Sequence, residues 1–80
     1  MFSKSIHSAE GVAFRTWLRQ QRIDSGLTLR QAGELLGIPH STVAKIENGE
    51  RRIDVVEYVH YCKVLNISPE AGLQIISKPG

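Results

Sequence analysis

The stretch of sequence that decides the fold is Leu29–Asn48, which reads LRQAGELLGIPHSTVAKIEN. Thr28 precedes it as a favourable N-cap, and the apolar spacing that follows predicts a helix over 29–36. Gly37 starts a Gly-Ile-Pro turn, because glycine adopts positive φ at little cost. A second helix is expected over 40–48, ending before the next glycine. The stretch therefore predicts two short helices joined by a tight turn.

Gly33 lies inside the first of these helices, where glycine costs about 1 kcal/mol relative to alanine. We interpret it as a point of close approach, at which a side chain larger than a methyl would wedge the helices apart. The apolar positions of the first helix are Leu29, Ala32, Leu35 and Leu36. The expected core between the two helices consists of Ala32, Leu36, Ile38, Val43 and Ile46. Such a pair is typical of a helix-turn-helix, whose second helix lies in the major groove of DNA.

Outside this pair, the same start and stop signals predict three more helices, over 9–25, 55–65 and 69–76. Ser8 is a plausible N-cap for the first, and Asp54 with Glu57 resembles a capping box for the second. The expected fold is all-α, with five helices in one compact domain. Its boundaries are a flexible N-terminal arm at 1–7, the domain at 8–76 with the helix-turn-helix at 28–48, and a tail at 77–80.

Composition limits what this chain can do. Its 80 residues are 41% hydrophobic and 22% charged, which predicts one small globular domain. No apolar run is long enough to span a membrane, and residues 1–7 lack the apolar segment of a signal peptide. The single cysteine, Cys62, cannot form an internal disulfide, which favours a cytoplasmic location. The basic excess lies within residues 1–52, whereas residues 53–80 are slightly acidic.

Catalytic and metal-binding patterns are missing from the sequence. No nucleophile–base set, carboxylate pair or glycine-rich phosphate loop stands out. His7, His60 and Cys62 lack the paired spacing of zinc ligands. We therefore expect a protein that is not an enzyme and that uses no metal or cofactor.

An ordered series of motifs runs from Phe14 to Ser68: Leu18-Arg19-x-x-Arg22, Gly26-Leu27-Thr28-Leu29-Arg30, Leu36-Gly37-Ile38, Ser41-Thr42-Val43, Ile46-Glu47-Asn48-Gly49-Glu50-Arg51 and Val64-Leu65-Asn66-Ile67-Ser68. This series resembles the phage repressor and Cro type (XRE family) of helix-turn-helix regulators. The resemblance implies a compact, lambda-repressor-like five-helix domain that binds operator DNA, usually as a dimer. It also implies a structural ion pair between Arg22 and Glu47, with two separate surface charges as the alternative.

The residues expected to contact DNA follow from the geometry of the helix expected over 40–48. Val43, Ile46 and Glu47 should face inward, which leaves the opposite face for the groove. The candidates for reading bases are His40, Ser41, Ala44 and Lys45. The candidates for phosphate contacts, which flank that helix, are Thr28, Arg30, Asn48, Arg51 and Arg52. For each of these, a solvated surface residue is the alternative interpretation.

The C-terminal third is more apolar than a small core requires. Leu73, Ile75 and Ile76 are the expected dimer interface, because large apolar patches are uncommon on monomers. The alternative is that these residues pack onto Phe14 and Trp17 of the first helix.

The sequence thus predicts a sequence-specific DNA-binding transcriptional regulator, expected to repress by occupying a palindromic operator as a homodimer. A phage regulator, a restriction-modification controller and an antitoxin all fit this description. The alternative class is an antitoxin or other protein-interaction module, whose C-terminal helices would bind a protein partner such as a toxin.

Overall fold

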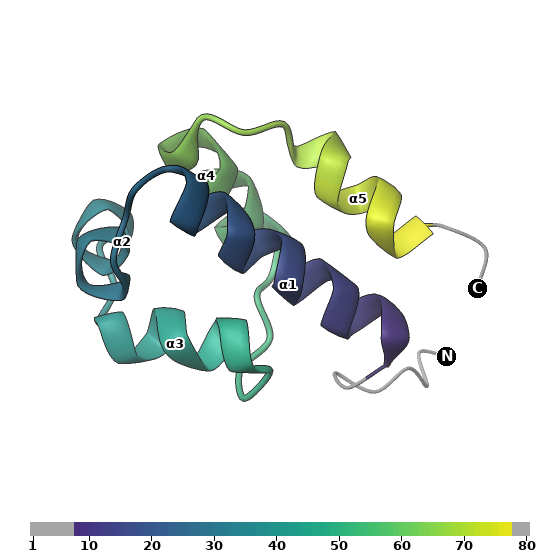
Figure 1. Ribbon diagram of the computed structural model, residues 1–80, viewed down its shortest axis with the longest axis horizontal. Coiled ribbons are helices and arrows are strands. Elements are labelled where there is room, and N and C mark those ends of the chain that lie inside the picture. The colour runs from purple at the N-terminus through teal and green to yellow at the C-terminus, as the bar shows by residue number, and fades with distance from the viewer. Residues whose placement is uncertain (1–7, 78–80) are drawn as a thin grey trace.

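The computed structural model describes residues 8–77, and these residues form helices without strands (Figure 1). The elements are α1 (Ala9–Asp24), α2 (Leu29–Leu36), α3 (His40–Asn48), α4 (Val55–Leu65) and α5 (Pro69–Ser77). The expected five-helix, all-α fold is confirmed, with helix ends within one residue of those predicted. The expected arm at 1–7 and the last three residues of the expected tail lie outside the described residues. No helix of this part of the chain is long and apolar enough to cross a membrane.

Side-chain caps define where three of the helices begin. The Ser8 hydroxyl accepts a hydrogen bond from the Gly11 amide at 3.2 Å, which caps α1. Thr28 and Gln31 form a full capping box on α2, although only the Thr28 half of it was predicted. Asp54 and Glu57 form the expected capping box on α4, at 2.7 and 3.0 Å. These local bonds satisfy amide groups that a helix start leaves open, so the helix boundaries follow from nearby residues.

The turn between α2 and α3 depends on two glycines. Gly37 has a φ of 73°, the left-handed conformation that the sequence predicted. A Cβ added at Gly33 would lie 2.7 Å from the carbonyl oxygen of Ile38 and 3.1 Å from the Cα of His40. Because both neighbours are backbone atoms, even a methyl group does not fit without displacement. The expected limit of one methyl group at Gly33 was therefore wrong, and the contact is tighter.

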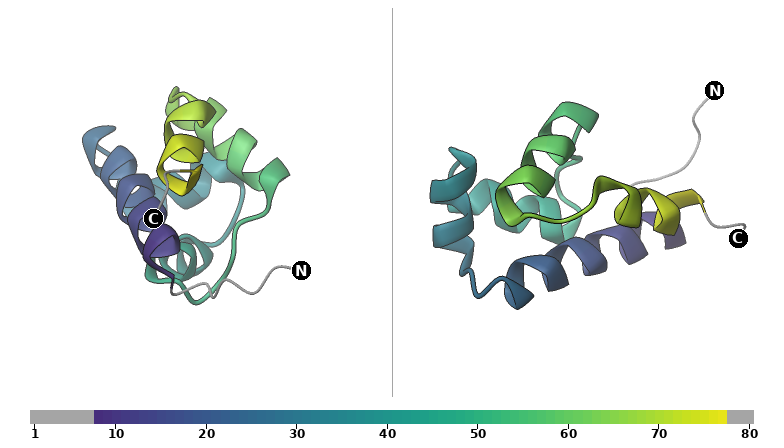
Figure 2. Two further views of the ribbon diagram at one scale, coloured as in Figure 1. Left: turned by 90° about the vertical axis from the view of Figure 1, so that its right-hand side faces the viewer. Right: turned by 90° about the horizontal axis from the view of Figure 1, so that it is seen from above.

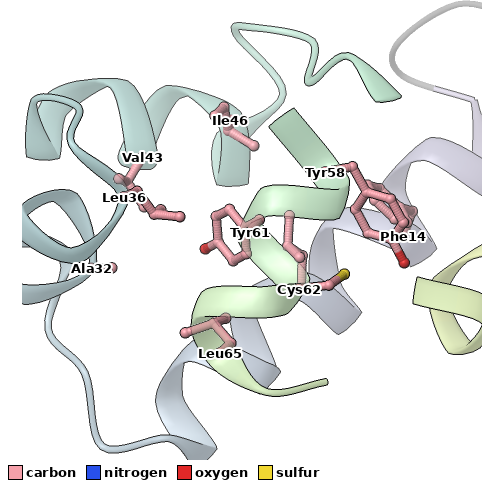
Figure 3. Close-up of a cluster of buried hydrophobic side chains, with 10 residues drawn as sticks. Phe14, Ala32, Leu36, Val43, Ile46, Tyr58, Tyr61, Cys62 and Leu65 are labelled. Atoms are coloured by element: carbon pink, nitrogen blue, oxygen red, sulfur yellow. The ribbon is translucent and has the colours of Figure 1, made fainter. Parts of the chain in front are cut away.

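The core lies between α1, α2, α3 and α4, and Figure 3 shows most of its side chains. Its buried apolar members are Phe14, Leu18, Ala32, Leu36, Val43, Ile46, Tyr58, Tyr61, Cys62 and Leu65. Leu35, an apolar position of α2 that the expected core did not include, is 54% exposed. The reason is that α2 buries only the face formed by Ala32, Gly33 and Leu36.

α5 packs along α1, as Figures 1 and 2 show. Gly72 is buried at this contact, and an added Cβ would lie 2.7 Å from the Trp17 ring. The Tyr58 hydroxyl donates to the carbonyl oxygen of Pro69 at 2.6 Å, which fixes the start of α5. Phe14 packs edge-to-face on Tyr58, with ring centroids 5.3 Å apart. Trp17 thus serves packing.

Candidate nucleic-acid interface

α3 presents a polar face to solvent and an apolar face to the core. Val43 and Ile46 are buried, at 0% and 2% exposure. His40, Ser41 and Lys45 are exposed, whereas Ala44 lies half-buried beside them. The structure therefore brings the four predicted base-reading residues together on one side of α3, where Ala44 is less exposed than the other three.

The start of α3 has an uncommon N-cap. Pro39 occupies this position and makes no side-chain hydrogen bond to the helix. Its carbonyl oxygen accepts from the amides of Thr42 and Val43, at 2.9 and 3.4 Å. Because proline offers no capping hydroxyl, the first amide groups of α3 lack the side-chain cap found on α1, α2 and α4.

The start of α2 carries two of the predicted phosphate-binding residues. Thr28 and Arg30 are both exposed. The Thr28 hydroxyl accepts from the Gln31 amide at 3.1 Å, so its own hydrogen remains available for donation. The partial positive charge of a helix N-terminus adds to the attraction for an anion at this point.

The other three predicted phosphate-binding residues lie at the end of α3 and in the loop to α4. Asn48 and Arg52 are exposed. Arg51 instead binds Glu57 of α4, with 2.7 Å between Nη2 and Oε2. The Arg51 side chain is still 40% exposed, so the three residues differ in pairing rather than in burial.

Arg22 and Glu47 form an ion pair between α1 and α3. The Arg22 Nε and Nη2 atoms donate to the two carboxylate oxygens of Glu47, at 2.7 and 3.0 Å. Arg22 Nη1 also donates to the carbonyl oxygen of Leu27, at 2.7 Å. The hydrogen bond to Glu47 raises the pKa of the Arg22 guanidinium despite its burial. The pair thus links α1, the α1–α2 loop and α3.

Two further buried contacts had no counterpart in the sequence pattern. The Tyr61 hydroxyl is buried next to Glu47 and Arg22, and it has no hydrogen-bond partner of ordinary geometry in the described part of the chain. Burial, followed by the Glu47 charge, raises the pKa of Tyr61. Arg15 is half-buried, and its guanidinium covers Gly49 at the end of α3. No sequence signal identifies either position, because both depend on contacts between distant helices.

The predicted dimer residues lie on α5 with different exposures. Leu73 and Ile76 are 50% and 45% exposed, whereas Ile75 is half-buried. Larger exposures occur at the start of α4, where Val55 and Val56 reach 77% and 80%. Exposed large apolar side chains also lie on α1 and α2, at Val12, Ile23 and Leu35, so the apolar surface is not confined to α5.

No group of three potential metal ligands lies together among residues 8–77. Cys62 is a free, buried cysteine, and burial raises the pKa of its thiol. It packs in the core as a small apolar side chain.

Comparisons with known proteins agree with this architecture. A helix-turn-helix family model matches residues 18–71. Among solved structures, the chain is similar to an XRE-family like protein from Pseudomonas syringae pv. tomato str. DC3000, with a TM-score of 0.78 and 37% identity. That match covers 89% of this chain and 87% of the other. No curated protein matches.

Proposed function

The chain belongs to the XRE family of helix-turn-helix DNA-binding regulators, and we propose that it represses transcription by occupying a palindromic operator as a homodimer. The observation that carries this proposal is the polar outer face of α3. Gly33 seats the start of α3 against α2 with no space for a side chain, so this face has a fixed position. A rigid helix with an exposed polar face is what entry into a major groove requires.

We assign base reading to the N-terminal part of α3. Lys45 can donate to guanine O6 and N7, and Ser41 can donate or accept. His40 can donate to a base acceptor or to a phosphate. Ala44 can contact a thymine methyl group, and its half-buried position limits it to bases that approach the helix closely.

Phosphate contacts would hold this helix in register on the duplex. Thr28 and Arg30 lie at the start of α2, and Asn48 and Arg52 lie at and beyond the end of α3. Contacts on both sides of a recognition helix fix its orientation without reading sequence. Arg51 flanks the same region, where it is paired with Glu57.

Dimerisation would use α5. Leu73 and Ile76 are about half exposed, and Ile75 lies beside them. A two-fold dimer would let two copies of α3 read half-sites about 34 Å apart. The slight acidity of residues 53–80 suits a surface turned away from DNA.

A second function is favoured by the surface at the start of α4. Val55 and Val56 are the most exposed large apolar residues of the described part of the chain. Such residues are candidates for contact with a protein partner. In this alternative the protein is an antitoxin or another interaction module, and its C-terminal helices bind the partner.

The experiment that tests the main proposal is selection of bound duplexes from a random DNA pool. A repressor of this kind should enrich one site with two-fold symmetry. Purified protein should bind that site with strong salt dependence, because Lys and Arg contacts to phosphates release counterions. Enrichment of no site, with weak binding to all duplexes, would favour the protein-interaction alternative.

A further inference from the structure

The loop between α3 and α4 is held by a two-pronged ion pair. Arg51 Nη2 and Nη1 donate to the two carboxylate oxygens of Glu57, at 2.7 and 3.2 Å. Nη1 also donates to the carbonyl oxygen of Arg52, at 3.1 Å. The Glu57 carboxylate accepts in addition from the Asp54 amide, as part of the α4 capping box. One guanidinium therefore fixes the end of the loop to the first turn of α4.

The beginning of the same loop is attached to α3. The amides of Glu50 and Arg51 both donate to the carbonyl oxygen of Lys45, at 2.8 and 3.2 Å. Lys45 is also the residue assigned above to guanine. The backbone of Arg51 is thus bound to the recognition helix, while its side chain is bound to α4. Figure 2 shows why this connection matters, since the start of α4 projects away from α1 and α5.

Arg52 differs from Arg51 in the contacts of its side chain. Its exposed side chain forms no ion pair with residues 8–77, whereas the Arg51 side chain, 40% exposed, is paired with Glu57 and also holds the Arg52 carbonyl oxygen. Moving Arg51 to a phosphate would leave Glu57 unpaired close to the negative charge of the DNA. If Arg51 stays bound to Glu57, no ion pair is broken when DNA binds, and Arg52 can supply the positive charge for the phosphate contact.

We propose that Arg51 is a positioning residue, which binds Glu57 in the free and the DNA-bound protein and holds Arg52 in place for the phosphate contact. This inference rests on the proposed DNA binding. It divides the work between two adjacent arginines, one acting through Glu57 and the other touching the phosphate.

The test compares affinity and salt dependence for five variants on the selected duplex. Arg52→Ala should lower the salt slope by about 0.9, the value for one lost phosphate contact. Arg51→Ala should weaken binding by about two- to tenfold at unchanged salt slope. This is the factor expected when one long side chain, that of Arg52, must be ordered on binding. Glu57→Gln should give the same result, since glutamine keeps an acceptor for the Asp54 amide but loses the charge. Arg51→Lys should not restore affinity, because an ammonium cannot form the two-pronged contact. Lys63→Ala, an exposed charge removed elsewhere on α4, is the matched control.

Hydrogen exchange in the absence of DNA gives a second, independent measurement. The amides of Glu50 and Arg51 should exchange faster in Glu57→Gln than in the wild type, while those of α1 stay unchanged. The inference would be overturned if Arg51→Ala lowered the salt slope, or if Glu57→Gln bound DNA more tightly than the wild type. It would also be overturned if each variant's loss of DNA affinity were explained by its fraction of unfolded protein alone. A wild-type protein without salt-dependent binding would instead refute the proposed function itself.

Discussion

Arg22 and Glu47 are 25 residues apart in the sequence, yet their side chains meet at 2.7 Å and are only 9% and 4% exposed. A buried ion pair contributes little net stability, because removing both charges from water costs nearly what their attraction returns. Its effect is on geometry. The third bond of Arg22, to Leu27, makes this pair the link that sets α3 relative to the start of α2. The proposed base-reading and phosphate-binding surfaces therefore share one support.

Glu47→Ala should destabilise the protein by about 3–5 kcal/mol, because it leaves the Arg22 charge buried and unpaired. The double change Arg22→Met with Glu47→Leu should recover much of this loss. Urea denaturation measures both. Asp24→Ala, which breaks an exposed hydrogen bond with Gln20, is the control and should change stability by less than about 0.5 kcal/mol. Midpoints unaffected by Glu47→Ala would mean that the pair does not constrain the fold.

Gly33→Ala should destabilise the protein by about 1–2 kcal/mol, although alanine is the better helix former by about 1 kcal/mol. The added methyl group would press on the backbone of Ile38 and His40 and shift α3. Binding to the selected duplex should fall as well, since base contacts need accurate placement. The sign of the stability change is decisive: a more stable variant with unchanged DNA affinity would show that the contact is not tight.

Tyr61→Phe should alter the response to alkaline pH. The pKa of Tyr61 is raised in the folded protein above its ordinary value of 10.0, chiefly by burial. The unfolded chain therefore ionises first, and stability is lost as pH rises above 10. The variant should lose less stability than the wild type in denaturation compared at about pH 7 and about pH 11. At neutral pH it should be equally stable or about 1 kcal/mol more stable, because the buried hydroxyl lacks a well-formed hydrogen bond. Identical alkaline profiles would place the ionisation elsewhere.

Leu73→Asp should separate the proposed dimer without unfolding its subunits. A carboxylate in an apolar interface costs several kcal/mol of association when it is fully desolvated. Sedimentation and circular dichroism measure assembly and helix content. Gln74→Asp adds the same charge at the neighbouring exposed position and should have little effect. A wild-type protein that stays monomeric at high concentration, free and on DNA, would remove α5 from the proposal.

The features that the sequence predicted well are those with local causes. Ser8, Thr28 and Asp54 begin helices where predicted, because a cap depends on residues only three positions away. The outer face of α3 was predictable for a similar reason. Once Val43 and Ile46 are known to be buried, helical periodicity places His40, Ser41 and Lys45 outside.

The features that the sequence did not predict depend on tertiary contacts. Arg51 lies in a basic run typical of phosphate binding, but the path of the loop brings it to Glu57. An apolar surplus was expected in the C-terminal third, but its position at Val55 and Val56 depends on the direction of α4. In each case the residue type indicated a kind of contact, but the sequence pattern could not show which tertiary neighbours the residue would have.

The central claim is that the exposed face of α3 reads bases, and Lys45→Ala tests it most directly. Binding-site selection should be run in parallel on the wild type and this variant. The account predicts that the variant loses preference at one base position in each half-site, with affinity for the wild-type site lower by about 1–3 kcal/mol. Its salt slope should change by at most about one charge, and its helix content should stay the same. An unchanged site preference and affinity would contradict the assignment of α3 as the recognition helix.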